Sequence, residues 1–390
     1  MKLRYARREH FCTRDSQGTR ILQWWNAKSQ DRPGFAILPQ PGDGLRKYTR
    51  EKCAPGYVLY TPDHSNKFLL INMEGKIVHE WPAFTSHFGY LLPNGHLLQD
   101  TEFSPDREWG VIEMDWDGAE VWSCPCQVHH DFQRLENGNT MVLCEREIED
   151  PRIAPGRLLS SYLMEVTPRR EVVWEWRSED HIEDFTRTLG VQFPRPNPDW
   201  THTNTVQVLP ETPASRDRRF KAGNVIISPR ELDAAVIIEK ETGKIVWGWG
   251  PGTLSRQHAT IVLPNGHLIC FDNGRERKAS AVWELDLLSG RIVWSYQGDE
   301  KEPFYASALS NAQRLPNGNT FICSGSKPDW GRLFEVTPEG EIVWEFQNPY
   351  AEYAEGEKIV YRAYKYSPEM IEPFLTRRSS TPPGLNPKTV

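Results

Sequence analysis

The sequence predicts an all-β protein, a six-bladed β-propeller with four antiparallel strands in each blade. A Leu-Pro-Asn-Gly or Leu-Glu-Asn-Gly turn recurs at 92–95, 135–138, 263–266 and 315–318, and a degenerate copy with an insertion begins at Leu209. Asn-Gly between apolar runs favours a tight hairpin because both residues accept a positive φ. Six Trp-bearing strands, from "GKIVHEW" to "GEIVWEF", begin near residues 75, 118, 170, 243, 290 and 340. Four-stranded units of this size are typical of propeller blades.

Each repeat contains its strands in the same order. A first strand ends at the Asn-Gly turn, a second follows it ("NTMVLC", "NTFICSG"), a third comes next ("AVWELD", "RLFEVT") and the Trp-bearing strand ends the unit. The 15 tryptophans of the chain suit wedge-shaped packing between blades, and we assign Trp247 and Trp294 to that packing. Three insertions, at 146–160, 178–200 and 211–222, are predicted to be loops on the rims of the ring.

The two ends of the chain are expected to meet in one blade. The first blade, "GYVLYTPDHSNKFLLINMEGKIVHEW", supplies only a second, third and fourth strand. We predict that residues 357–366 return as its innermost strand, because β-branched and aromatic residues are frequent there; an appended helix or rim strand is the alternative. The predicted boundaries are 1–55 for an N-terminal covering or connecting segment, 56–366 for the propeller and 367–390 for a partly disordered C-terminal tail.

Composition excludes several classes of function. The chain has 390 residues and a formal net charge of -7, whereas a nucleic-acid surface needs a basic excess. It lacks the run of about 18 apolar residues that a membrane span requires. The charged start does not resemble a secretory signal, and seven scattered cysteines do not suggest a disulfide framework. We therefore expect a cytoplasmic protein without a membrane or nucleic-acid partner and without a cofactor, and the oligomeric state stays open. A lone Cys-Pro-Cys at 124–126 does not define a metal or redox site.

Histidine recurs at one position of the repeat. The position five residues before the leucine of each turn lies in the strand that lines the central channel of a propeller. It is occupied by His87, His130, Asn204, His258 and Ser310. With only 11 histidines in the chain, this recurrence indicates a site rather than chance. His202 is two residues before Asn204, on the same face of an extended strand. The same alternation predicts that His129 points away from His130, and that Asp131 has no part in the site.

Four motifs that contain these residues resemble a known family. They are "HHDF" at 129–132, "DWTHTNTV" at 199–206, "VIISPRELDAAVIIEK" at 225–240 and "SRQHATIVLPNGHLICFDNG" at 255–274. In this order they look like the motifs of the PAPS-independent arylsulfate sulfotransferases, which are six-bladed propellers, and the resemblance covers roughly residues 55–350. Because we find no signal peptide, the sequence resembles the shorter branch of that family.

The resemblance implies a set of roles. His258 corresponds to the histidine that becomes transiently sulfated, while His130, His202 and Arg230 correspond to the residues around the sulfuryl group. Chemistry agrees, because a neutral imidazole is a competent nucleophile and a guanidinium presents a planar fork to sulfuryl oxygens. His202 and the Asn204 amide would add hydrogen-bond donors.

Proton transfer and substrate contacts complete the hypothesis. His130 would give a proton to the departing phenolate and take one from the incoming phenol. His87 and, through the closing strand, Arg362 are further candidates for substrate contact; a single strand histidine such as His87 also fits a structural role. The expected partner is a small anionic aromatic substrate, and no metal ligand is assigned.

Two other classes of function remain open. Three imidazoles that converge on a channel also suit Mn²⁺, Fe²⁺ or Zn²⁺, as in a metal-assisted lyase or hydrolase acting on an acidic sugar or another anionic substrate. An arginine close to the cluster favours an anion over a cation. The other alternative is a non-catalytic propeller that serves as a binding platform, since fold alone does not define function.

Overall fold

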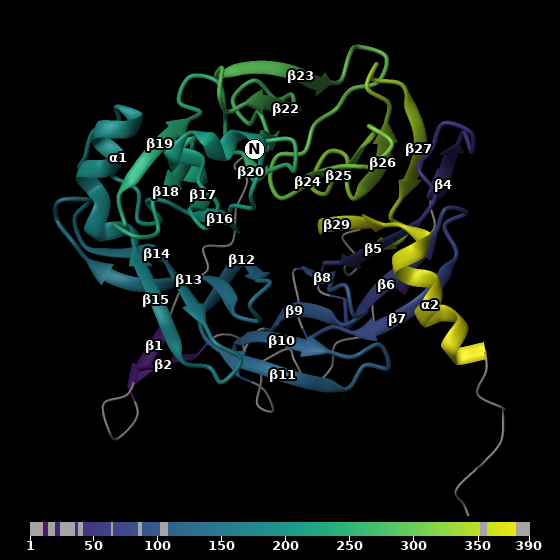
Figure 1. Ribbon diagram of the computed structural model, residues 1–390, viewed down its shortest axis with the longest axis horizontal. Helices are drawn as coiled ribbons and strands as arrows, with labels where there is room; N and C mark the ends of the chain where they lie inside the picture. Colours follow the sequence, from purple (N-terminus) through teal and green to yellow (C-terminus); the bar gives the residue numbers. More distant parts are fainter. Residues whose placement is uncertain are drawn as a thin grey trace, which may run out of the picture.

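Six antiparallel sheets surround a central axis in the computed structural model, which confirms the predicted propeller (Figure 1). The structure describes residues 11–14, 20–23, 36–37, 42–63, 65–84, 88–101, 108–351 and 357–379. Within each sheet the strands follow one another in chain order from the centre of the ring outward, except where the chain ends meet. Within this part of the chain, no helix is both long and apolar enough to cross a membrane.

Blades two to five each consist of four consecutive strands. Blade two contains β8 (Gly89–Leu91), β9 (Leu97–Thr101), β10 (Gly110–Met114) and β11 (Glu120–Pro125). Blade three contains β12 (Val128–Arg134), β13 (Thr140–Glu149), β14 (Arg157–Val166) and β15 (Val172–Arg177). Blade four contains β16 (Thr203–Val208), β17 (Val225–Pro229), β18 (Ala235–Ile238) and β19 (Ile245–Trp249). Blade five contains β20 (His258–Val262), β21 (His267–Asp272), β22 (Ala281–Asp286) and β23 (Arg291–Gln297).

Blade one is completed by the C-terminal part of the chain, as predicted. Its strand order is β29 (Val360–Tyr366), β5 (Tyr57–Pro62), β6 (Lys67–Asn72) and β7 (Ile77–Pro82). In the register of β29 and β5, Ala363 lies opposite Tyr60 and Tyr366 opposite Tyr57. The closing strand therefore pairs an edge that would otherwise be exposed.

Blade six has a fifth strand that the sequence did not predict. It contains β24 (Asn311–Arg314), β25 (Thr320–Ser324), β26 (Arg332–Val336) and β27 (Ile342–Gln347). Outside β27 lies β4 (Gly44–Tyr48), so part of the segment 1–55 that we expected to cover or connect belongs to a blade. Shorter N-terminal pairs are β1 (Phe11–Arg14) with β2 (Arg20–Gln23) and β3 (Ala36–Ile37) with β28 (Tyr350–Ala351).

The insertions and the tail are more regular than expected. The predicted loop at 146–160 is mostly an extended hairpin, because β13 and β14 stay paired as far as Glu149 and Arg157. The insertion at 178–200 contains a 3₁₀ turn, η1 (Ser178–His181), and the helix α1 (Ile182–Leu189), and that at 211–222 contains two 3₁₀ turns, η2 (Pro213–Arg216) and η3 (Arg218–Phe220). The tail begins with the helix α2 (Pro368–Ser379), which buries Ile371 against an apolar cluster of blades one and two. Residues 380–390 lie outside the described residues.

Tryptophans of the outer strands bind one blade to the next. In five blades an indole Nε1 donates to a backbone carbonyl in the turn between the third and fourth strands of the following blade. These bonds join Trp81 to Asp115, Trp122 to Pro168, Trp174 to Lys240, Trp294 to Pro338 and Trp344 to Met73. The predicted role of the tryptophans is thus confirmed for Trp294, and Trp247 packs in the apolar cluster between blades four and five.

Candidate functional site

Bulges in the inner strands determine how the candidate side chains are oriented. Four of these strands shift register beside the predicted site residues, between Val128 and Phe132, Thr203 and Val206, His258 and Ile261, and Val360 and Ala363. A bulge breaks the two-residue alternation of a strand and turns a side chain in a new direction. His130 and His202 have positive φ angles of 69° and 42°. Because non-glycine residues adopt this conformation rarely, strain at both histidines indicates that this end of the inner strands has a functional role.

Hydrogen bonds at one ring nitrogen hold His258 in a single tautomer, and the other ring nitrogen is left without a partner among the described residues. Its Nδ1 lies 2.6 Å from Asn273 Oδ1 and 3.2 Å from the Arg256 carbonyl oxygen, and both of these atoms are acceptors. Asn273 Nδ2 donates to the carbonyls of Ala306 and Leu309, which fixes the orientation of its amide. Nδ1 therefore carries the proton and Nε2 the lone pair. That Nε2 is buried and has no hydrogen-bond partner among the described residues.

A second group joins three side chains from blades three and four. His202 Nδ1 is bonded to Asp199 Oδ2, and His202 Nε2 lies 3.1 Å from His130 Nε2. The rings of His130 and His202 cross at 76° with their centroids 4.6 Å apart. The structure thus brings together two of the histidines that the sequence singled out, and adds Asp199 from the same "DWTHTNTV" motif.

His129 also belongs to this group, so its predicted orientation was wrong. Its ring centroid is 3.8 Å from that of His130, and it forms an ion pair with Glu145 at 3.5 Å. The bulge and the positive φ of His130 bring the two neighbours to the same side, which strict alternation forbids. Ring nitrogens of His129, His130 and His202 lie within 4.8 Å of one another.

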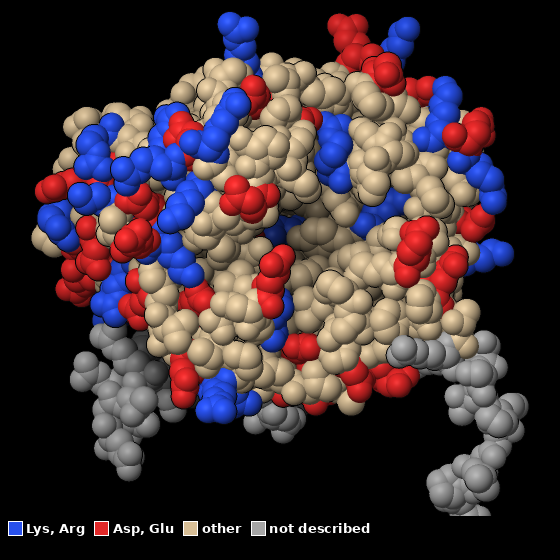
Figure 2. Space-filling model, in the orientation of Figure 1, with Lys and Arg blue, Asp and Glu red and all other residues tan. Residues whose placement is uncertain are grey.

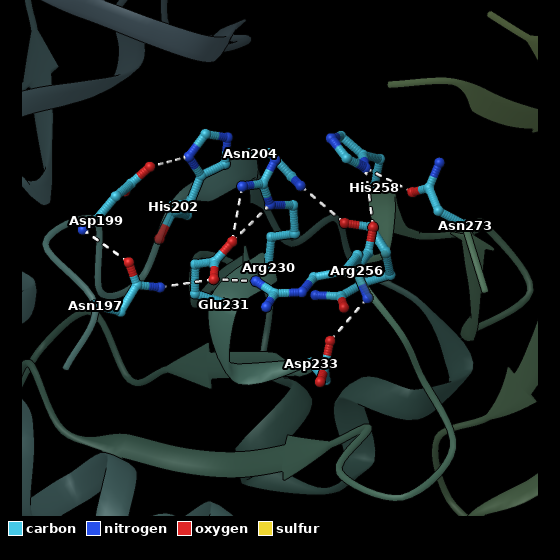
Figure 3. A network of polar contacts seen from close by, with 12 residues as sticks. Asn197, Asp199, His202, Asn204, Arg230, Glu231, Asp233, Arg256, His258 and Asn273 are labelled. Atoms are coloured by element: carbon cyan, nitrogen blue, oxygen red, sulfur yellow. Dashed lines mark hydrogen bonds and ion pairs between the residues drawn. The ribbon is translucent and has the colours of Figure 1, made fainter. Parts of the chain in front are cut away.

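Two arginines share one carboxylate beside the histidines. Arg230, in the 3₁₀ turn η4 (Arg230–Leu232), donates from Nη2 and Nε to Glu231 Oε1 at 2.7 and 3.1 Å. The Glu231 Oε2 atom pairs with Arg256 and accepts a bond from Asn197. Figure 3 shows Arg230 between His202 and His258, whose rings point to the same side of this network. A guanidinium has five N–H donors, so the bonds to Glu231 use only part of the Arg230 set.

The electrostatics keep two of the imidazoles, His258 and His130, neutral. Burial and the nearby Arg230 hold the pKa of His258 well below its ordinary value. Burial and the adjacent imidazoles of His129 and His202 do the same to the pKa of His130. Burial alone would raise the pKa of Glu231, but Arg230 and Arg256 hold it below its usual value. Two guanidinium ions beside a neutral His258 suit an anionic ligand better than a cation.

Asn204 and Arg362, the predicted substrate contacts, are buried and form hydrogen bonds within the protein. The Asn204 Nδ2 donates to the Gln257 carbonyl at 2.8 Å and so fixes the peptide before His258. Arg362, 4% exposed, donates to the Asn204 carbonyl at 2.5 Å and pairs with Asp131 at 3.2 Å. Asp131 also accepts from the Val206 backbone N–H. These contacts cross-link the inner strands of blades one, three and four.

His87 lies outside the described residues. On the face shown in Figure 2 the ring is hollowed at its centre, with basic and acidic side chains at the margin of the hollow. Arg230 and Arg256 retain 19% and 33% side-chain exposure, so an entering anion can reach both guanidinium groups.

The chain matches the family model described as arylsulfotransferase (ASST) over residues 109–349. This match spans more than half of the chain and contains all four motifs of the site. The chain belongs to the arylsulfotransferase family. A comparison with curated protein sequences finds no match.

The first solved structure below shares the fold of this chain. A protein of unknown function from Bacteroides caccae superimposes with a TM-score of 0.54 at 16% identity, over 80% of this chain and 99% of that one. AztD from Citrobacter koseri gives a TM-score of 0.34 at 11% identity, over 80% of this chain and 73% of that one. The Dos1 propeller gives 0.39 at 12% identity, over 78% and 76%.

In this arylsulfotransferase-family protein, sequence reasoning missed several residues of the site. Asp199 and Glu231 lie close to assigned residues inside two of the quoted motifs, and Asn273 is the second-last residue of a third. These three residues are part of the motifs, but the spacing of residues in a motif does not show which polar side chains face the histidines. Arg256 precedes the strand of His258 with a φ of 61°, a loop conformation that no strand pattern predicts.

Proposed function

We propose that this arylsulfotransferase-family protein transfers a sulfuryl group from an aryl sulfate ester to a phenol through a sulfohistidine at His258. The observation that carries the proposal is the geometry of that residue. A neutral imidazole whose Nδ1–H is bonded to Asn273 leaves the Nε2 lone pair as its nucleophile, beside a guanidinium that suits an anion. Because Nε2 is buried, the ester must move neighbouring side chains to reach it.

In the first step the His258 Nε2 lone pair forms an N–S bond while the S–O bond to the aryl group breaks. The ring keeps its Nδ1–H and gains positive charge, so its bond to Asn273 Oδ1 strengthens in the transition state. Arg230 donates to the sulfuryl oxygens. The aryl oxygen leaves with a proton from one ring nitrogen of His130, while the other nitrogen takes a proton from a neighbouring donor so that the ring stays neutral.

In the second step the oxygen of the acceptor phenol attacks the sulfur and the N–S bond breaks. His130 takes the phenol proton and returns a proton to the neighbouring donor. His258 returns to the neutral form with its lone pair on Nε2, so atoms and charge balance over the cycle. Splitting one transfer into two lets the donor leave before the acceptor binds.

The direct test is incubation with p-nitrophenyl sulfate, followed by intact-protein mass measurement and peptide mapping. We expect an adduct of about 80 Da, the approximate mass of SO₃ in such a covalent intermediate, on His258. A panel of phenols should then discharge it. His258→Ala should lose adduct and turnover, whereas His267→Ala, in the same blade but paired with Glu284 at its turn, should keep both.

One observation favours a second candidate function. The three ring nitrogens of His129, His130 and His202 lie close enough together to bind one divalent cation, and Glu145 and Asp199 stand behind two of them. Such a site would suit metal-assisted hydrolysis of an anionic substrate. Stoichiometric metal in the purified protein, with activity lost in a chelator, would support this candidate. Full activity without metal would contradict it.

A further inference from the structure

We propose that Asp199, His202 and His130 form a relay that moves one proton to and from the oxygen bonded to sulfur, with Asp199 as its positioning residue. The inference rests on the proposed sulfuryl transfer and extends it to the proton. Its basis is the continuous contact from Asp199 Oδ2 to His202 Nδ1, and from His202 Nε2 to His130 Nε2 at 3.1 Å.

The position of Asp199 is fixed by its neighbours in the chain. Trp200 is 1% exposed, and its Nε1 donates to Ser160 Oγ at 3.2 Å. On the other side, the Pro198 carbonyl accepts from the Leu159 backbone N–H at 2.6 Å. The loop is thus attached to blade three, while His202 leads into the first strand of blade four. This anchoring distinguishes the pair from a flexible surface ion pair.

The hydrogen-bond chemistry of the chain allows two proton arrangements. An ionised carboxylate only accepts, so Asp199 requires a proton on His202 Nδ1. The contact between the two Nε2 atoms then holds a single proton. Either His202 is an imidazolium and donates to His130, or both rings are neutral and His130 donates to His202. The two arrangements differ by one proton, which is the amount that each half of the reaction moves.

The proton balance follows from these two arrangements. When the aryl oxygen leaves, His130 gives it the Nδ1 proton and receives the Nε2 proton of His202, which becomes neutral. When the acceptor phenol attacks, its proton goes to His130 Nδ1 and the Nε2 proton returns to His202. The relay keeps the positive charge on the ring that touches Asp199. His130 itself is a poor place for that charge, because burial and its neighbours lower its pKa.

Charged groups on the neighbouring elements favour the ionised form of Asp199 that the relay requires. Asp199 faces Arg230 and Arg256, whose guanidinium groups stabilise the carboxylate that accepts from His202. His129 lies on the other side of the relay and pairs with Glu145.

The test is Asp199→Asn. An amide presents its NH₂ group to His202 Nδ1 and favours the other tautomer, with the proton on Nε2. We expect ¹⁵N NMR of histidine-labelled, ligand-free protein to show a change in the His202 tautomer. We also expect kcat on phenyl sulfate to fall about 10²- to 10⁴-fold, the range of a general acid or base, with KM nearly unchanged. The loss on p-nitrophenyl sulfate should be smaller, because its better leaving group needs less protonation.

Matched variants separate a positioning role from a structural one. Asp184, on α1, forms another i,i+3 pair with a histidine, at 3.0 Å from His181. Asp184→Asn removes that carboxylate and should change neither the NMR readout nor the kinetic readout. Asp199→Glu should restore part of the activity. An unchanged His202 tautomer, or equal losses on both esters, would overturn the relay. Failure of the wild-type protein to form sulfohistidine would instead overturn the proposed function, since the NMR readout does not depend on turnover.

Discussion

Asn273 Oδ1 lies 2.6 Å from His258 Nδ1, and this contact determines which nitrogen of the ring can react. The amide accepts the Nδ1 proton and leaves the Nε2 lone pair for the substrate. A neutral acceptor has a further consequence. It orients the ring without adding a negative charge that would stabilise the imidazolium and block the nucleophile.

Asn273→Asp tests that consequence. A carboxylate at this position should raise the pKa of His258, so the variant should lose activity as the pH falls from 8 to 5.5, through protonation of Nε2. In the wild-type protein the pKa of His258 is already well below its ordinary value, and the nucleophile should stay neutral over this range. The pH dependence of kcat/KM is the measurement. Asn265→Asp, beside His267 in the same blade, is the matched control; superimposable profiles for all three proteins would contradict the assignment.

The buried imidazoles should also make the fold sensitive to acid. The unfolded chain binds protons at both rings below about pH 6.5, whereas folded His130 and His258 resist them. Their contribution to stability is therefore complete above about pH 6.5 and is lost as the pH falls toward the lower pKa values of the folded state. Urea unfolding between pH 7.5 and 5.5 should show a slope of up to about 1.4 kcal/mol per pH unit for each ring. His130→Asn with His258→Asn should flatten that slope, and an unchanged slope would show that the rings titrate normally.

Arg230 should not tolerate lysine. A lysine keeps the charge but loses the planar fork, and hydrogen bonds to charged groups are worth about 1.5–3 kcal/mol. Arg230→Lys should therefore lower kcat/KM for an aryl sulfate by roughly 10- to 100-fold. Arg218→Lys, at an exposed pair with Glu239, is the control and should be neutral. Equal activity of the two variants would remove Arg230 from the anion site.

Arg362 should matter for stability more than for substrate binding. Its guanidinium and Asp131 form a pair with side-chain exposures of 3% and 9%, and this pair ties the closing strand to blade three. Arg362→Met leaves a buried carboxylate unpaired and should cost about 3–5 kcal/mol in urea unfolding. Adding Asp131→Asn should recover part of that loss. Arg50→Met, at an exposed pair with Glu74, should cost less than about 1 kcal/mol.

The fold was predictable because its signals are local. Each Asn-Gly turn requires positive φ, and in five blades the fourth strand carries a tryptophan bonded to the following blade, so a few residues of each repeat define the architecture. The closing strand was predictable from the missing inner strand of blade one. The strand β4 was not, because "GLRKY" has no turn or tryptophan in register with the repeats.

The sequence predicted which histidines belong to the site, but it did not predict which way the side chains point. Repeat register and motif singled out His130, His202 and His258; the structure places His130 against His202, and Arg230 between His202 and His258 (Figure 3). Register assumes strict alternation, however, and the bulges break it at His129. The same rule does not tell that Asn204 bonds the peptide before His258, or that Arg362 is neutralised by Asp131. These outcomes depend on partners from other blades, which sequence spacing does not contain.

The most direct test of the account is the mass of the protein during turnover. After brief exposure to p-nitrophenyl sulfate without acceptor, intact-protein mass measurement should show one adduct of about 80 Da, as expected for a covalent sulfuryl intermediate. Fragmentation of the peptide that contains "SRQHATIV" should place it on His258, and added phenol should remove it. Turnover without any adduct, or an adduct that persists in His258→Ala, would contradict the central claim.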